Sequence, residues 1–373
     1  MLRWTLIAGA FVTWVTVLGC VMWPADAPAQ RGSHVALEDT PAPSTPVGTI
    51  TSRTGLPYVA VAMQIQRTDW IDKYKANMDE IAALGADSVL LVIDTRTENI
   101  HSARIWLDTR YTATPEQLGD LIRHAKSKKL RVILMPVVLL DNPGEDWRGK
   151  IQPDEEFGGW SEWFKSYRDM IKQFSWVAEG NGVDVLVVGS ELVSTESHVD
   201  EWIETIREVR KLYHGRITYS SNWDHYDKVK FWDHLDLIGL NSYWSFGKKE
   251  KNPDPSLDQI MTRWKEIQSD LLPFVQKSGK PLLFLEIGWF SQNNVAYEPW
   301  DYTREQPIDL DLQKRLYEGF FRSWWGNPLL GGFCIWEWPP VEGGPNDGGY
   351  TPKNKPAEKV IREFLAKPRW EVK

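Results

Sequence analysis

Two glutamates stand at positions where an ionised side chain has to be paired or used. Glu191 follows an apolar run at residues 184–188, and Glu286 follows another at residues 282–285. Taking a carboxylate out of water is costly unless it gains partners. Either glutamate alone could form a salt bridge or cap a helix. Two carboxyls about 5–5.5 Å apart can do more, because one can protonate a leaving oxygen while the other attacks an anomeric carbon.

Eight short apolar runs follow one another from Tyr58 onward and alternate with amphipathic stretches. This alternation predicts βα units and a parallel sheet. Eight strands are the number that a closed (β/α)₈ (TIM) barrel of the α/β class needs. The predicted strands cover residues 58–63, 88–94, 131–138, 184–188, 217–221, 235–240, 282–285 and 332–336.

The barrel would bring the two glutamates together. In this fold the chemistry lies at the C-terminal ends of the strands. Glu191 follows the fourth predicted strand and Glu286 the seventh, and these strands face each other across the barrel mouth. We therefore expect the separation that hydrolysis with retention requires. The proton donor of such a pair should have its pKa raised by apolar surroundings and by its anionic neighbour.

Start and stop signals place several helices between the strands. A helix over residues 69–84 is predicted to end at Gly85, which serves as its C-terminal cap. Thr114 is predicted to cap the next helix, with Pro115 at the first helical position. Further helices are predicted over residues 159–178, in a Trp-rich segment, and over residues 357–365.

The composition favours a small-ligand cleft with aromatic walls. The 373 residues include 21 Trp, 12 Tyr and 13 Phe. About half of these rings would pack helices against the sheet, and the rest suit a cleft that stacks on the apolar faces of sugar rings. The net charge is −8 without a basic run, so no nucleic-acid partner is expected.

Other chemistries lack their motifs. The two cysteines, Cys20 and Cys334, form no disulfide framework, and there is no C-x-x-C or H-E-x-x-H motif. The seven histidines are scattered, so we predict neither a catalytic metal nor a cofactor. No glycine-rich phosphate cradle is visible near the last two predicted strands. We expect a monomer.

The N-terminal segment predicts export. Residues 4–23 carry no charge and follow Arg3, a pattern that fits a transmembrane anchor or a cleaved signal peptide. Val17-Leu18-Gly19-Cys20 also resembles a lipobox, which would place a lipid on Cys20. Residues 24–57 are rich in Pro, Ala, Ser and Thr and predict a flexible linker before a barrel over residues 58–367. All three interpretations place the protein in the periplasm or outside the cell, with membrane contact only through this segment.

Several motifs together resemble glycoside hydrolase family 113, in the clan of retaining hydrolases built on this barrel. They are Gly189-Ser190-Glu191-Leu192-Val193-Ser194-Thr195-Glu196, Gly239-Leu240-Asn241-Ser242-Tyr243-Trp244, Leu285-Glu286-Ile287-Gly288-Trp289, Gly349-Tyr350-Thr351-Pro352 and Lys355-Pro356-Ala357. The resemblance covers most of the chain from Tyr58 onward. It implies endo-β-1,4-mannanase activity on a poly- or oligosaccharide.

The resemblance also implies roles for individual residues. Glu191 would be the acid/base and Glu286 the nucleophile. Tyr243 would hydrogen-bond the nucleophile, Trp336 would floor the subsite that holds the distorted sugar, and Arg96 would steady the Glu286 carboxylate. The alternative for Tyr243 and Trp336 is that both are ordinary core aromatics.

Further residues could bind substrate. Many clan members carry Asn where this chain has the shorter Ser190, so the contact to the sugar 2-hydroxyl could come instead from Asn222 or Asn241. Trp289 belongs to one of the motifs and is a further candidate for substrate binding. Glu196 and Glu337 could bind a hydroxyl, although a charge on the rim of the barrel is the favoured interpretation for both.

Two other functions stay open. A β-glucanase or galactanase of the same clan would use the same carboxylates, since a few loop contacts rather than the fold decide which sugar is bound. A surface barrel that binds carbohydrate without cleaving it would keep the aromatic platform, although both acids are present here.

Overall fold

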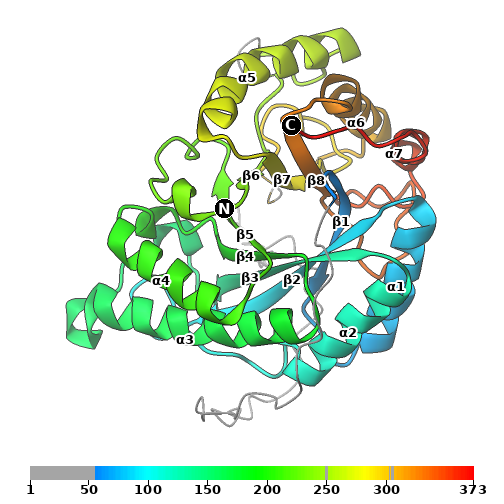
Figure 1. Ribbon diagram of the computed structural model, residues 1–373. Helices are drawn as coiled ribbons and strands as arrows, with labels where there is room; N and C mark the ends of the chain where they lie inside the picture. The colour runs from blue at the N-terminus through cyan, green and yellow to red at the C-terminus, as the bar shows by residue number, and fades with distance from the viewer. Residues whose placement is uncertain (1–54, 248–250, 302, 304–305) are drawn as a thin grey trace, which may run out of the picture.

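Eight parallel strands close into a barrel in the computed structural model, which describes residues 55–247, 251–301, 303 and 306–373. The strands pair in chain order, and the last returns to the first (Figure 1). The predicted barrel is therefore confirmed. The strands are β1 (Tyr58–Ile65), β2 (Ser88–Thr97), β3 (Arg131–Leu140), β4 (Val185–Ser190), β5 (Arg216–Asn222), β6 (Ile238–Asn241), β7 (Leu282–Ile287) and β8 (Leu330–Ile335).

Seven α-helices of the described residues surround the barrel. They are α1 (Ile71–Leu84), α2 (Pro115–Ser127), α3 (Gly159–Gly180), α4 (Val199–Leu212), α5 (Leu257–Ser278), α6 (Leu310–Trp324) and α7 (Pro356–Leu365). Between β5 and β6 the chain forms only a short 3₁₀ turn, η4 (Trp232–His234). Phe231 and Trp232 are buried in this connection, so it covers the barrel without a helix.

The predicted helix ends are found where the sequence signals stand. Gly85 ends α1 in the left-handed conformation, with φ 100°, and its N–H donates to the Ala82 carbonyl. Thr114 caps α2 by accepting a hydrogen bond from the Gln117 N–H, and the Gln117 side chain accepts one from the Thr114 N–H. Pro115 occupies the first turn of that helix as expected.

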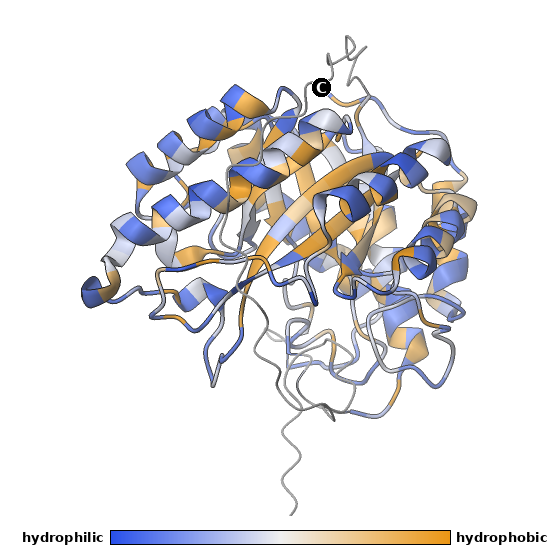
Figure 2. Cartoon of the chain, turned by 90° about the horizontal axis from the view of Figure 1, so that it is seen from below, coloured by the Kyte–Doolittle hydropathy of each residue, from blue (hydrophilic) through white to orange (hydrophobic). Residues whose placement is uncertain are grey.

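Two apolar layers hold the barrel together. Small and branched side chains such as Ala60, Ile133 and Val187 fill its interior, and a larger layer lies between the strands and the helices. Figure 2 shows the strands coloured as hydrophobic and much of the surrounding helices as hydrophilic. Many tryptophans belong to the outer layer, including the fully buried Trp163 and Trp264, which agrees with a packing role for part of the aromatic content.

The predicted N-terminal anchor over residues 1–23 and most of the predicted linker over residues 24–57 lie outside the described residues. Within the described ranges, no helix combines the length and the apolar character that a membrane crossing demands.

Loss of the Thr114 cap should destabilise the protein. Thr114→Ala leaves the Gln117 N–H in the first turn of α2 without its side-chain acceptor, and we expect the free energy of unfolding to fall by about 1 kcal/mol. The midpoint of urea unfolding measures the change. Thr114→Ser keeps the hydroxyl and serves as the control, so an equal loss in both variants would contradict the capping role.

Candidate active site

Glu191 and Glu286 meet at the C-terminal mouth of the barrel. Asn241, the last residue of β6, donates through Nδ2 to Glu191 Oε1 at 2.8 Å and to Glu286 Oε1 at 3.1 Å. These two oxygens are therefore no more than about 5.9 Å apart, the sum of the two distances. This upper limit is compatible with the separation of about 5–5.5 Å in a retaining carboxylate pair and lies below the about 6.5–9.5 Å of an inverting pair.

Local irregularities of the sheet aim these side chains. Asn241 and Glu286 are partners in the β6–β7 ladder, and the register shifts just before them. The β4–β5 register also shifts, between Val187 and Ser190, and the following residue, Glu191, adopts φ 55°. A bulge next to a site re-aims a side chain that regular pairing would direct elsewhere. Positive φ in a residue with a side chain marks a backbone that its surroundings must hold in place.

The orientation of the Asn241 amide is fixed by a neighbour on β5. Ser220 Oγ donates to Asn241 Oδ1 at 2.7 Å, so the amide nitrogen must face the two carboxylates. Asn241 and Ser220 are both fully buried. Tyr243, two residues beyond β6, donates its hydroxyl to Glu286 Oε2 at 2.7 Å. The sequence-based pairing of Tyr243 with Glu286 is thus present in the structure.

Arg148 is a site residue that sequence reasoning missed. Its Nη2 donates to Glu191 Oε2 at 2.6 Å, and its Nε donates to the Ser190 carbonyl at 3.2 Å. The arginine lies in the 3₁₀ turn η1 (Arg148–Lys150), in the long connection after β3. Its sequence signal was weak, because a single cation in a polar loop carries no periodicity.

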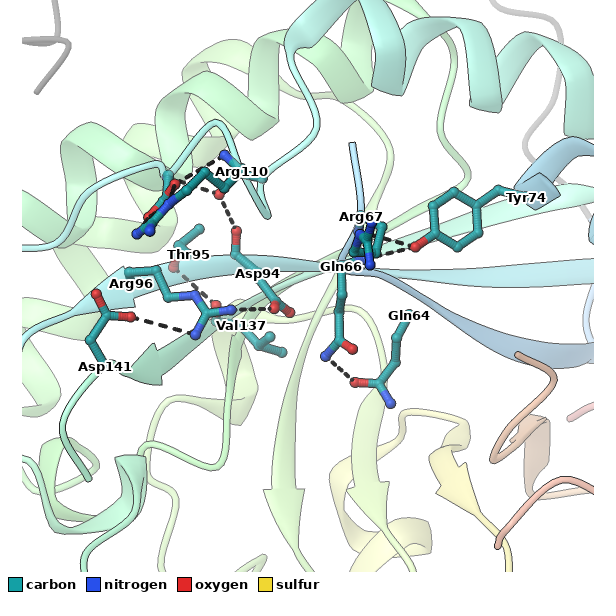
Figure 3. Close-up of polar contacts among 12 residues, drawn as sticks. Gln64, Gln66, Arg67, Tyr74, Asp94, Thr95, Arg96, Arg110, Val137 and Asp141 are labelled. Carbon is teal, nitrogen blue, oxygen red and sulfur yellow. Dashed lines mark hydrogen bonds and ion pairs between the residues drawn. The ribbon is translucent and has the colours of Figure 1, made fainter. Parts of the chain in front are cut away.

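The expectation that Arg96 steadies Glu286 is wrong. Figure 3 shows Arg96 between Asp94, 3.0 Å away, and Asp141, 3.5 Å away. Asp94 and Arg96 are two residues apart on β2, so their side chains share one face of the strand and pair with each other. The cation that reaches the carboxylate pair is Arg148, and it binds Glu191 rather than Glu286.

Burial raises the pKa of Glu286 to about 8, and the nearby Glu191 carboxylate adds to the increase. The Tyr243 hydrogen bond and the charge of Arg148 act in the opposite direction. The sequence analysis expected the raised pKa on the proton donor, assigned to Glu191. The structure places a raised pKa on Glu286, which is almost completely buried and has a second carboxylate beside it.

Glu196 and Glu337 are not rim charges, contrary to the favoured interpretation. They are only 3% and 8% exposed, and burial raises the pKa of each to about 7. Glu196 accepts from the Tyr219 hydroxyl at 2.9 Å, and Glu337 accepts from Gln64 Nε2 at 2.8 Å. Partners inside the fold, which the sequence pattern did not reveal, account for their burial.

Trp289 does not reach the barrel mouth. Its ring is fully buried and packs edge-on against Tyr317 and against Phe246, so its predicted part in substrate binding is wrong. Trp336 follows β8 and remains partly exposed. A Cβ on Gly288 would lie 2.0 Å from the Trp336 carbonyl oxygen, so only glycine fits where β7 passes the backbone of this tryptophan.

A pair of tryptophans that the sequence analysis did not single out stands beside Tyr243. Trp223, the residue after β5, stacks on Trp300 with ring centroids 5.2 Å apart. Trp223 also meets the edge of Tyr243 at 6.2 Å. Both tryptophans are partly exposed, so the pair offers an aromatic surface next to the residue that binds Glu286.

Ser190 and Asn222 end β4 and β5, and each has a buried polar atom without a hydrogen-bond partner among the described residues. These atoms are Ser190 Oγ and Asn222 Oδ1. A buried polar atom is normally paired, so these two atoms are exceptions at the C-terminal ends of their strands. No group of three or more His, Cys, Asp or Glu in the described part of the chain could hold a metal ion.

Comparison with known proteins agrees with this geometry. The family model of glycoside hydrolase family 113 matches residues 59–353. The chain belongs to this family. It is therefore a glycoside hydrolase on a barrel of the clan that the sequence resemblance implied. Glu191 and Glu286 lie within the matched range, and the Lys355-Pro356-Ala357 motif lies just beyond it.

Solved structures of family 113 are similar over nearly their whole length. The β-mannanase AaManA from Alicyclobacillus acidocaldarius is 28% identical, with a TM-score of 0.74, and the match covers 83% of this chain and 98% of that one. A second structure, of a family 113 β-1,4-mannanase, is 26% identical with a TM-score of 0.75. The match covers 84% of this chain and 100% of that one.

A curated relative lies outside this group. The meiotic sister chromatid recombination protein 1 of Saccharomyces cerevisiae is 25% identical over an alignment of 244 residues, and the match covers 58% of this chain. The match spans 43% of the yeast protein, so this chain covers less than half the length of that relative.

The raised pKa of Glu286 predicts how stability depends on pH. Its carboxyl binds a proton more tightly in the folded chain than in the unfolded chain, where the ordinary value is 4.5. Unfolding thus releases a proton between about pH 5 and pH 8, and stability falls as the pH rises through that window. Glu286→Gln should remove this contribution. The melting temperature of the variant minus that of wild type should therefore increase as the pH rises.

Melting temperatures measured from about pH 5 to pH 8 test this. Glu371→Gln makes the same change of charge at an exposed position and is the control. A Glu286→Gln advantage that shrinks with rising pH would contradict the assignment.

Proposed function

We propose that the protein hydrolyses β-1,4-linked mannan or manno-oligosaccharides with retention of configuration. Glu191 acts as acid/base and Glu286 as nucleophile. The observation that carries the proposal is the bridge from Asn241 to both carboxylates, which limits their nearest oxygens to about 5.9 Å. Family membership supports the reaction class, and the similarity to β-mannanases supports the choice of sugar.

The reaction follows two displacements. In the first, a Glu286 oxygen bonds to the anomeric carbon while the bond to the leaving oxygen breaks and Glu191 gives that oxygen a proton. In the second, Glu191 takes a proton from water, the water oxygen bonds to the anomeric carbon, and Glu286 leaves as a carboxylate. The free enzyme is regenerated with its proton on Glu191.

The first step needs one proton on the pair and a charge on Glu286. Two close carboxyls titrate together, so the pair keeps a proton well above the ordinary range of a single glutamate. The hydrogen bonds that Tyr243 and Asn241 donate to Glu286 favour the charge on that side chain. The proposed mechanism proceeds from the form of the pair in which Glu286 is charged and the shared proton lies on Glu191, which faces the leaving oxygen.

Sugar recognition would use polar and aromatic groups around the pair. Ser190 Oγ and Asn222 Oδ1 are buried without a partner among the described residues, so a sugar hydroxyl that reached them after a side-chain movement would supply the missing hydrogen bond. Trp336 and the stacked Trp223 and Trp300 offer apolar ring faces. Such groups around a cleft are typical of sites for small ligands.

Purified wild type should release shorter sugars from β-1,4-mannan, while Glu191→Gln and Glu286→Gln should each lose at least about 10²–10⁴-fold in rate. NMR of the first products should show the β anomer, as retention requires. Glu371→Gln, with the same change of charge at an exposed site, should keep its activity.

A panel of polysaccharides decides between sugars. Faster hydrolysis of β-glucan or galactan than of mannan would replace the proposed substrate and keep the chemistry. Saturable glycan binding without any product, or equal turnover by wild type and both glutamate variants, would contradict the hydrolytic proposal.

We also propose that the protein is exported. The uncharged residues 4–23 after Arg3 support this, and so does a polymeric substrate that cannot cross a membrane. In a bacterial host, fractionation should find the full chain outside the cytoplasm, and deletion of residues 1–23 should retain it inside. Cys20→Ser separates a lipid anchor from the other two leaders, since only a lipoprotein would then leave the membrane fraction. A full chain that stays in the cytoplasm would contradict export.

A further inference from the structure

A buried pair of side chains lies directly behind Glu191. Tyr219 on β5 accepts a hydrogen bond through its hydroxyl from the Leu192 N–H at 3.0 Å and donates one to Glu196 Oε1 at 2.9 Å. Tyr219, Leu192 and Glu196 are at most 3% exposed. The contact joins β5 to the backbone of the residue that follows Glu191.

The backbone at this point needs such support. Glu191 adopts φ 55°, which residues with a side chain seldom occupy and which the surroundings have to maintain. Its own N–H donates to the Ser220 carbonyl at 2.9 Å, and the next N–H, of Leu192, donates to Tyr219. Two consecutive residues of β5, Tyr219 and Ser220, therefore accept hydrogen bonds from the N–H groups of Leu192 and Glu191, which flank the Glu191 Cα.

Packing leaves the Tyr219 ring little freedom. Its centroid lies 5.3 Å from those of Trp202 and Phe231, in edge-to-face contacts. A Cβ on Gly189 would come within 2.6 Å of the Trp202 ring and 2.9 Å of the Tyr219 ring. Both rings thus press against the glycine that precedes Ser190 and Glu191, and the position of the Tyr219 hydroxyl is set by the core.

Glu196 is buried although it touches neither Glu191 nor Glu286 by a hydrogen bond in the described structure. Burial raises its pKa to about 7, and the charge of Asp224 adds to this. Its Oε2 has no hydrogen-bond partner among the residues that the structure describes, and His225 Nδ1 is 3.6 Å away. Burying a carboxyl costs free energy, and the hydrogen bond from Tyr219 offsets only part of that cost. The presence of Glu196 at this position therefore calls for an explanation.

The chemistry of a phenol supplies one. A tyrosine hydroxyl has one proton to donate and can accept through its lone pairs. Because Glu196 takes the proton, the lone pairs of Tyr219 are directed to the Leu192 N–H. A carboxyl oxygen serves as this acceptor in either protonation state of Glu196.

We propose that Tyr219 and Glu196 are positioning residues for Glu191, holding its backbone so that its carboxyl can reach the leaving oxygen. The proposal rests on the proposed function, in which Glu191 is the acid/base. Neither residue contacts the sugar in this scheme. Their loss should therefore weaken proton donation, while nucleophilic attack by Glu286 stays intact.

Leaving groups of different acidity separate these two effects. A poor leaving group needs a proton from Glu191, whereas 2,4-dinitrophenolate departs without one. With aryl β-manno-oligosaccharides, kcat/KM reports the step that forms the glycosyl-enzyme. For Tyr219→Phe we expect kcat/KM to fall about 10- to 100-fold on mannan and on the phenyl substrate, and to stay within about threefold of wild type on the dinitrophenyl substrate.

Two variants of the carboxyl test the second member of the pair. Glu196→Gln keeps an oxygen that accepts from Tyr219 and should retain most of the wild-type rate on the phenyl substrate. Glu196→Leu removes the acceptor and should show the same dependence on the leaving group as Tyr219→Phe. These variants decide the question even if Tyr219→Phe fails to fold.

Tyr213→Phe is the matched control. It also removes a buried hydroxyl, which donates to the Val183 carbonyl at 2.8 Å, at the opposite end of β4 from Glu191. It should show no dependence on the leaving group. Equal losses on both substrates for Tyr219→Phe and Glu196→Leu, or no loss on either, would overturn the positioning role.

The reference variant Glu191→Gln keeps a failure of the two proposals apart. If Glu191→Gln is sensitive to the leaving group and the pair variants are not, only the positioning proposal is overturned. If wild type hydrolyses no substrate, or if Glu191→Gln behaves as wild type, the proposed function fails and the positioning role fails with it.

Discussion

One amide group organises the mouth of this barrel. Asn241 donates to both carboxylates from a single nitrogen, and Ser220 holds its oxygen so that the nitrogen cannot turn away. The amide keeps the two carboxyl groups close together, although they would repel each other if both were ionised. Because one donor serves both, a change at Asn241 disturbs Glu191 and Glu286 together. Effects of substitutions in this trio should therefore be strongly non-additive.

The rest of the site balances charge around that amide. Arg148 faces Glu191 and Tyr243 faces Glu286, so each carboxyl has one further donor of its own. At Glu286 burial acts against the donors and raises the pKa of the carboxyl. The two close, buried carboxyls are unfavourable for stability, but the proposed reaction needs them there. Such a trade-off between activity and stability is common in enzymes.

Much of the fold was predictable because its strands are buried on both faces. β3 is an almost uninterrupted apolar run, so its identity did not depend on distant contacts. The start of β6 was harder to predict from the sequence. Leu235 and Leu237 are apolar like strand residues, but they precede Ile238, where the strand begins. The two acids were found by their position after such runs, which is a local signal.

The partners of those acids were harder to predict, because closure of the barrel decides them. Arg148 lies 43 residues before Glu191, and only the folded chain brings them together. Arg96 lies near the C-terminal end of a barrel strand, where site residues are expected, but it forms an ion pair with Asp94 on the same face of that strand. Trp289 follows Glu286 closely, but the chain turns its ring into the core. Proximity in sequence to a reactive residue did not decide which side chains face the cleft.

The close passage of Gly288 against Trp336 limits how the cleft can be redesigned. The backbone after β7 lies directly against the carbonyl of the tryptophan that follows β8, with no room for a methyl group. The backbone that follows Glu286 is therefore closely packed against the backbone of the tryptophan proposed as the floor. Broader substrate tolerance would have to come from other loops, such as the connection between β5 and β6 that bears Trp223, where the barrel has no covering helix.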